Sequence, residues 1–490
     1  MPLTPVSLGV RSNQARDTAI SAAKLVNAYA EDVGEEGKIK YPIVACDGFD
    51  SFSTLTGVDT GGLRAGLALT DSALYVVTGS KVRKVNASGV ETQITGSVTA
   101  TGLVTMARNR KATPQIGIVA GGTYYTLESD TLTDQTTLIN SLAASGSLTS
   151  IDSVDGYGIL FFDSGEFFLT SIDEWTAIDS LDFAAAEANP DGGRRVIVRG
   201  RNVIFAGPKS LESWLNTGAT DFPFERQDTS NIGCYAAGSM VALTAVIDGR
   251  TVDTIAWAAT NSDGSYSGVM LLTDGLAGSK ISTLAVDRDV ESVTDPTTIR
   301  AFTWARGGHV FYVITDLSTF THAYDTTTGF WHERTSSGLD FWRVSMAVAF
   351  GSKIIAGDYT LANLYHMRDG INDSINPSVL TLKHSNDNGD TWAATRTKTL
   401  SGSADRKQRV KINRLGQSKE DGKLFNIAIS HAVMENGQAN DMIIQPPAIQ
   451  AWPNPMRFYG VHIDTVPGVS QTSRSKAVAG LAVDAVSVKG

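Results

Sequence analysis

Short runs of apolar residues recur along the first three quarters of the chain, each interrupted by a tight polar or glycine-containing turn. They begin near Leu63, Val104, Ile151, Val196, Asp253, Ala301 and Val344. The spacings between successive starts are 41, 47, 45, 57, 48 and 43 residues. A four-stranded blade of a β-propeller takes about 40–50 residues. One such sheet cannot bury both of its faces alone, so stacking the units around an axis is the economical arrangement.

This pattern predicts an all-β protein with a β-propeller over residues 46–370. The propeller would have six or seven blades, depending on whether residues 40–57 complete one of them. Two packed β-sandwiches also place a turn about every 8–12 residues and are the alternative. The nearly constant spacing of the units favours the propeller.

Two parts of the chain lie outside the repeat. Residues 1–45 show no regular period, and we expect an N-terminal arm that packs with the C-terminal domain. Residues 371–490 open with a polar stretch and then predict a separate, β-sandwich-like domain. Its expected strands are Val379–Lys383, Gln408–Leu415, Leu424–Ile429, Arg457–Asp464 and Gly480–Val488.

Composition narrows the class of protein. The 490 residues include 47 glycines, which suits many short strands and tight turns. A net charge of −10 argues against a protein that grips nucleic acid over its whole surface. No apolar run approaches the ~18 residues of a membrane-spanning helix, and the N-terminus lacks a secretory pattern, so we expect no membrane insertion. Two cysteines cannot make a disulfide scaffold, which favours assembly in a reducing cytoplasm.

The charge is unevenly shared along the chain. Residues 371–490 hold 14 Lys and Arg against 10 Asp and Glu, a net of +4, so the rest of the chain carries −14. The densest basic stretch, residues 406–414, would as a strand place Lys407, Arg409 and Lys411 on one face. Such a face is either simply solvated or in contact with DNA phosphates or an acidic partner. The same two interpretations apply to a second cluster, made of Arg194, Arg195, Arg199 and Arg201.

The sequence offers no catalytic constellation. The seven histidines have no zinc-site spacing, and neither a phosphate-binding loop nor a nucleophile elbow is present, so we expect no catalytic, metal or cofactor site. The acidic pairs Asp152 with Asp155 and Glu187 with Asp191 could supply a general acid and base. In glycine-rich turns such residues more often bond the backbone.

One turn motif stands out in the C-terminal part. Residues 385–392 have the form S-x-D-x-G-x-x-W of the Asp-box, carried by Ser385, Asp387, Gly389 and Trp392. Its side chains bond amides of the turn, glycine supplies a positive φ, and the tryptophan is expected to pack beneath. Glycosidases contain this motif too, but a single copy outside the repeat favours a structural turn.

Several stretches in order along the chain resemble one family, the tail accessory proteins of short-tailed bacteriophages, known as packaged-DNA stabilisation or tail nozzle proteins. The residues that carry the resemblance are 25–31, 47–49, 55–57, 188–192, 207, 210–214, 217–219, 222–226, 280–283, 308–313, 324–325, 329–334, 385–392 and 414–416. No single piece is diagnostic, but together they span nearly the whole chain.

The resemblance implies a structural protein of the virion tail, assembled in the host cytoplasm. It implies a homohexamer that extends the DNA channel of the portal and adaptor, passes genomic double-stranded DNA without sequence preference, and helps retain it. It also implies an attachment platform for tailspikes, tail fibres or a tail needle. The alternative is a carbohydrate-binding propeller or a glycosidase acting on host surface polysaccharide, which would need paired carboxylates near a cleft.

Overall fold

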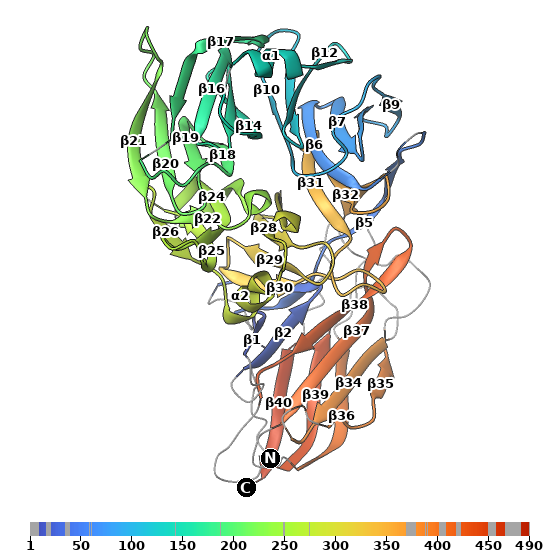
Figure 1. Cartoon of the computed structure of the whole chain (residues 1–490). Coiled ribbons are helices and arrows are strands. Elements are labelled where there is room, and N and C mark those ends of the chain that lie inside the picture. Colours follow the sequence, from blue (N-terminus) through green and yellow to red (C-terminus); the bar gives the residue numbers. More distant parts are fainter. Residues whose placement is uncertain are drawn as a thin grey trace.

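The computed structural model describes residues 9–489 except 16–20, 35–39, 58, 60, 143, 187, 248–249, 274, 369–378, 388, 390, 401–407, 418–422, 449–456 and 466–481. Its regular structure is almost all strand, which confirms the all-β class. The helical pieces are α1 (Thr136–Ser141), α2 (Leu284–Glu291) and the 3-10 turns Ala237–Ser239 and Pro296–Thr298. Figure 1 shows a ring of sheets, with an elongated group of strands below it.

Five sheets of the propeller are separate antiparallel meanders. The first two consist of β6 (Leu63–Thr70), β7 (Ala73–Thr78), β8 (Lys81–Val85), β9 (Glu91–Gln93), and of β10 (Val104–Arg108), β11 (Ile116–Ala120), β12 (Thr123–Glu128), β13 (Thr131–Asp134). The next two consist of β14 (Leu148–Val154), β15 (Tyr157–Phe162), β16 (Glu166–Ser171), β17 (Glu174–Ala185), and of β18 (Arg195–Arg199), β19 (Asn202–Ala206), β20 (Leu211–Asn216), β21 (Phe224–Ser230). The fifth consists of β22 (Gly233–Cys234), β23 (Val241–Ile247), β24 (Arg250–Thr260), β25 (Tyr266–Leu272) and β26 (Gly278–Lys280).

Two further four-stranded units belong to one 14-stranded sheet. They are β27 (Arg300–Arg306), β28 (His309–Thr315), β29 (Thr321–Asp325), β30 (Phe330–Glu333), and β31 (Val344–Phe350), β32 (Lys353–Asp358), β33 (Asn363–Arg368) with β5 (Gly48–Thr54). The first strands lie against one another in the order β6, β10, β14, β18, β23, β27, β31, and β31 lies against β6. The expected count of six or seven blades is therefore wrong. Five blades are separate sheets, and a shared sheet completes the ring.

The pattern of burial explains why these sequences form blades. The second strands, such as β11 and β15, are buried along almost their whole length, because both of their faces pack against neighbouring blades. Fourth strands such as β21 carry mainly exposed polar residues. Apolar runs therefore mark the middle of each blade, and alternating or polar runs mark its rim.

Six of the seven predicted repeat starts lie on the first strand of a unit. The exception is Asp253, which lies on β24 of the fifth sheet. The strand of this sheet that lines the ring, β23, begins twelve residues earlier, at Val241, and α2 lengthens the connection to β27. The irregular spacing of 57 residues marks this departure.

The N-terminal arm forms β1 (Asn13–Gln14), β2 (Ala22–Val26), β3 (Ala28–Ala30) and β4 (Ile43–Ala45). Beyond the propeller lie β34 (Val379–Ser385), β35 (Arg396–Thr399), β36 (Gln408–Gln417), β37 (Leu424–Glu435), β38 (Gln438–Gln445), β39 (Arg457–Thr465) and β40 (Ala482–Lys489). Strands thus occur at all five of the ranges expected there, and β35 and β38 are additional. The expected strand over residues 424–429 continues to Glu435 as one arm of a long hairpin.

The propeller and the C-terminal strands share hydrogen-bonded sheet. Strand β2 pairs with β30 of the propeller on one side and with β38 on the other. Strand β37 pairs in turn with β5, the outer strand of the last unit. The hairpin β37–β38 therefore lies between two adjacent parts of the propeller, and Figure 1 shows it meeting the ring from below. The division of the chain at residue 371 stays a prediction.

A single apolar core holds the C-terminal strands and the arm together. Leu25, Ala28 and Ile43 of the arm lie in the same buried cluster as Leu380 of β34 and Ile444 of β38. The three-stranded sheet β36–β39–β40 contributes to this cluster as well, through Val410, Ile412, Leu415 and Ile463. The arm therefore buries its apolar side chains against C-terminal strands.

Candidate interaction surfaces

The turn after β34 has the hydrogen bonds that the motif predicts. Oγ of Ser385 accepts hydrogen bonds from the amides of Asp387 (3.2 Å) and Gly389 (2.8 Å). Oδ1 of Asp387 accepts one from the amide of Thr391 at 2.9 Å. Gly389 has a φ of 104°, which a side chain would strain. Trp392 is 39% exposed, so its indole is only partly covered, and its packing beneath the turn stays a prediction.

A strand, β36, lies where the basic strand is predicted, but the structure does not describe the side chains of Lys407, Arg409 and Lys411. Lys407 is among the residues not described, and for Arg409 and Lys411 only the backbone is described. These two residues lie on β36, where they pair with Asp464 and His462 of β39. The intervening Val410 and Ile412 are buried in the C-terminal core. The interpretation of this stretch as a partner or DNA contact therefore stays a prediction.

Two of the four acidic residues, Asp152 and Asp191, accept hydrogen bonds from the backbone, whereas Asp155 forms an ion pair with Arg201. Asp152 lies within β14 rather than in a turn, and its Oδ2 accepts a hydrogen bond from the amide of Val198 on the next blade at 2.8 Å. Asp191 accepts hydrogen bonds from the amide of Lys209 and the hydroxyl of Ser210. Glu187 is outside the described residues.

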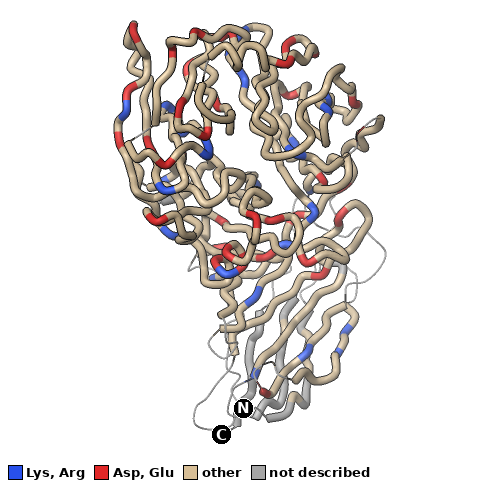
Figure 2. The backbone as a smooth tube through the Cα atoms, in the orientation of Figure 1, with Lys and Arg blue, Asp and Glu red and all other residues tan. Residues whose placement is uncertain are grey.

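The described part of the chain contains no group of three or more His, Cys, Asp and Glu residues able to hold a metal ion. No helix in that part is long and apolar enough to cross a membrane. Figure 2 shows positions of acidic and basic residues along the propeller and its loops, and several basic positions on the C-terminal strands.

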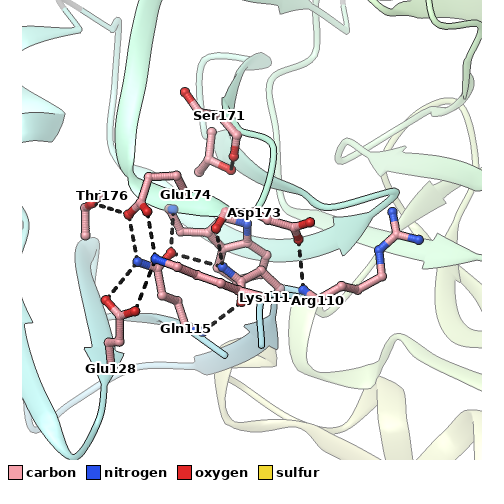
Figure 3. A network of polar contacts seen from close by, with 11 residues as sticks. Arg110, Lys111, Gln115, Glu128, Ser171, Asp173, Glu174 and Thr176 are labelled. Carbon is pink, nitrogen blue, oxygen red and sulfur yellow. Dashed lines mark hydrogen bonds and ion pairs between the residues drawn. The ribbon is translucent and has the colours of Figure 1, made fainter. Parts of the chain in front are cut away.

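A polar network joins the second and third blades (Figure 3). Its centre is Gln115, which is fully buried. The side-chain Nε2 of Gln115 donates to Glu128 at 3.0 Å and to Glu174 at 2.8 Å, and its Oε1 accepts the amide of Trp175 at 2.7 Å. Nζ of Lys111 lies 3.2 Å from Glu128 and 2.8 Å from Glu174. The loop before β11 is thus fixed to the start of β17.

The pKa values of Glu174 and Lys111 are shifted in the directions that the contacts of this network produce. Hydrogen bonds from Lys111, Gln115 and Thr176 lower the pKa of Glu174 to about 2. The same carboxylates raise the pKa of Lys111. The side chains of Lys111 and Glu174 remain partly exposed, so water weakens their attraction. The hydrogen bonds of Gln115 are made in a fully buried place and are not weakened in this way.

A second network lies where the hairpin β37–β38 meets the propeller. Nε1 of Trp342 donates a hydrogen bond to Oε1 of Glu435 at 2.7 Å. The guanidinium of Arg334 lies 4.1 Å from the ring centroid of Trp342 and donates to the carbonyl of Asp47 at 2.8 Å. All three side chains are almost completely buried. Burial raises the pKa of Glu435, and the charge of Arg334 opposes this shift.

Asn27 connects the arm to both neighbours at this junction. Its Nδ2 donates to the hydroxyl of Thr335 at 3.1 Å and to the carbonyl of Asp441 at 3.2 Å. Its Oδ1 accepts the amide of Thr335 at 3.0 Å. Its φ of 54° is in the left-handed region, which asparagine tolerates better than most residues. The Asn in the motif at residues 25–31 thus has a structural reason that the sequence did not reveal.

These features define a β-propeller protein whose ring is joined to a second group of strands by shared sheet and by buried polar contacts. A family model described as bacteriophage P22 Gp10, beta-propeller, matches residues 5–372. The chain therefore belongs to this family of bacteriophage structural proteins, and is part of the virion. The match confirms the resemblance drawn from the sequence.

Other comparisons add little. No curated protein matches the chain. Among solved structures, the WD40 β-propeller domain of Doa1 is 13% identical, with a TM-score of 0.38 over 65% of this chain and 96% of that one. Virginiamycin B lyase from Staphylococcus aureus is 10% identical, with a TM-score of 0.43 over 64% of this chain and 97% of that one. Scores this low carry no argument about function.

Proposed function

We propose that the protein is the tail nozzle of a short-tailed bacteriophage, a homohexameric ring that extends the DNA channel of the portal and adaptor. The observation that carries the proposal is the family match over residues 5–372. In this role the ring passes the double-stranded genome, helps retain it after packaging, and holds tailspikes, tail fibres or a tail needle. It is assembled in the host cytoplasm and needs no catalytic site.

The junction supports a structural role of this kind. A nozzle must transmit force between its attachment to the adaptor and its outer parts without letting them swing. Sheet pairing of β2 with both β30 and β38, and of β37 with β5, provides such a connection. Buried contacts such as that of Trp342 with Glu435 reinforce it. Linkers between independent domains would leave relative motion as the default.

Charge suggests which end meets the adaptor. Residues 371–490 are net positive while the rest of the chain carries −14. We place this part, with the N-terminal arm, at the adaptor and the propeller away from it. The acidic balance of the propeller also suits a conduit, because a strongly basic one would hold the DNA that must leave.

Reversing the basic strand tests this orientation. The triple change Lys407→Glu, Arg409→Glu and Lys411→Glu is expected to slow docking onto the portal–adaptor complex and to remove its salt dependence, because charges at the rim of an interface mainly set the association rate. The control reverses Lys383 and Lys398, two exposed residues on β34 and β35 of the same part of the chain.

Docking is measured by surface plasmon resonance at low and high salt. A triple variant that docks like the parent at both salt concentrations would leave these residues as a solvated face. Binding of polysaccharide instead of the adaptor would favour the carbohydrate-binding alternative.

A further inference from the structure

Three arginines from different blades occupy the same end of the propeller ring. Arg64 is the second residue of β6, and Arg195 and Arg300 are the first residues of β18 and β27. Each of these strands is the first of its meander, and all three belong to the closed series of first strands. Their first residues therefore lie at one end of the ring, where the blades converge. All three residues are mostly buried.

The guanidiniums of Arg64, Arg195 and Arg300 differ in the number of hydrogen bonds that they donate. Arg64 donates to four backbone carbonyls, those of Gly79, Thr99, Thr101 and Gly102, at 2.6–2.9 Å. Arg300 donates through Nη1 to the carbonyls of Thr297 and Ile299. Arg195 donates no hydrogen bond to any described residue, and its Nε is completely buried without a partner. Carbonyl bonds orient a guanidinium but leave its charge uncompensated.

Carboxylates near these arginines are engaged elsewhere. Asp59, Asp152 and Asp295 are the acidic groups close enough to influence Arg64, Arg195 and Arg300, respectively. They accept the amides of Ser80 at 2.5 Å, Val198 at 2.8 Å and Thr297 at 2.9 Å. Within the described part of the chain, none of the three arginines forms an ion pair with them. Burial also raises the pKa of Asp152, whereas its backbone hydrogen bonds and Arg195 act in the opposite direction.

The arginines also repel one another. Burial lowers the pKa of Arg300, and the charges of Arg64 and Arg195 lower it further. Burial likewise lowers the pKa of Arg195. A buried charge without a partner is costly, and an arginine stays charged at any ordinary pH. A bound anion would remove both the repulsion and the unused donors.

We propose that this end of the propeller ring is a binding site for a small oxyanion of the phosphate class, with Arg195 as its main ligand and Arg300 beside it. Guanidinium donors form a planar fork that suits tetrahedral oxyanions, which accept two parallel hydrogen bonds. Arg64, whose four carbonyl bonds hold it in place, contributes charge. The inference does not depend on the proposed role in the phage tail.

The test is calorimetric titration of the full chain with inorganic phosphate, in chloride buffer of constant ionic strength. We expect saturable binding by the parent protein and at least tenfold weaker binding by Arg195→Gln. The matched control is Arg201→Gln, because Arg201 lies just after β18 but is 71% exposed, in an ion pair with Asp155 at 3.3 Å. It should bind phosphate like the parent.

Thermal unfolding supplies the second readout. Phosphate should raise the melting temperature of the parent and of Arg201→Gln but not that of Arg195→Gln. Without phosphate, Arg195→Gln should melt no lower than the parent, because it removes a repulsive charge. If Arg195→Gln fails to fold, Arg195→Met replaces it. No saturable phosphate binding by the parent, or equal binding by the Arg195 variant, would overturn the proposal.

Discussion

The indole Nε1 of Trp342 donates a hydrogen bond of 2.7 Å to Oε1 of Glu435, which lies 93 residues further along the chain. Trp342 lies two residues before β31 of the propeller, and Glu435 ends β37 at the tip of the C-terminal hairpin. The contact is buried on both sides. This buried pair, with Arg334 stacked on the indole, therefore adds to the sheet pairings that join the propeller to the C-terminal strands.

Glu435→Ala should lower the free energy of unfolding by about 1–3 kcal/mol, as expected when a buried donor loses its hydrogen-bond acceptor. It leaves Nε1 of Trp342 without an acceptor and Arg334 without its nearby carboxylate. Glu435→Gln keeps the size and one acceptor oxygen and should cost much less. Urea unfolding followed by tryptophan fluorescence measures both. Equal, small losses in the two variants would show that the junction does not couple the two parts.

Acid should destabilise the protein through His332, which is 2% exposed. Burial lowers its pKa to about 3, and the nearby charge of Arg334 acts in the same direction. Between pH 6.5 and 3 the unfolded chain therefore binds a proton that the folded one resists. This histidine's contribution is fully present above pH 6.5 and is lost as pH falls, by about 1.4 kcal/mol per pH unit.

His332→Phe, which cannot titrate, should flatten this part of the stability profile. The free energy of unfolding is compared with that of the parent at pH 7, 6 and 5. His384, whose pKa burial lowers to about 4, leaves part of the slope in place. An unchanged slope in the variant would mean that His332 is protonated as easily in the folded protein as in the unfolded chain.

Gln115→Ala should destabilise the protein by about 2 kcal/mol, because the amide of Trp175 loses its acceptor in a buried place. Lys111→Met is the matched control, since Lys111 touches the same two carboxylates from the solvent side. We expect its effect to be small and to shrink further at high salt. Thermal unfolding distinguishes the two. A larger loss for Lys111→Met than for Gln115→Ala would reverse the assignment.

Much of the fold could be predicted from periodicity alone. The start of β10 at Val104 and of β31 at Val344 followed from apolar runs, because the middle of each blade is buried on both faces. The sharing of one sheet by two blades could not be predicted. It depends on the pairing of β2 with β38, whose residues Leu25 and Ile444 are separated by most of the chain.

The candidate sites also divide into features that the local sequence predicts and features that depend on distant parts of the chain. The hydrogen bonds of Ser385 and Asp387 are local, so a short motif encodes them. The sequence also reveals the basic cluster at residues 194–201, but it does not distinguish a solvated face from a contact with a partner or DNA. The surroundings of Arg195 depend on Arg64 and Arg300, because the closed ring brings the first strands of their blades together. The residues next to each arginine in the sequence do not reveal that the three lie at the same end of the ring.

The exposure of Trp392 changes the expected cost of removing it. Trp392→Ala should lower the stability of the C-terminal strands by about 1–2 kcal/mol, less than the about 3–5 kcal/mol typical of a buried aromatic side chain. Asp387→Ala should cost about 1–3 kcal/mol, because its carboxylate accepts from the backbone and the hydroxyl of Thr391. Differential scanning calorimetry measures both. A loss of 3 kcal/mol or more for Trp392→Ala would mean that the indole is buried.

The most direct test of the proposed role is to mix the purified protein with its portal–adaptor complex and to image the product by negative-stain electron microscopy. Light scattering gives the mass before and after mixing. We expect a ring of about six copies on the adaptor, with the C-terminal strands toward it and the propellers away from it. A protein that stays monomeric and binds neither the adaptor nor any other tail component would contradict it.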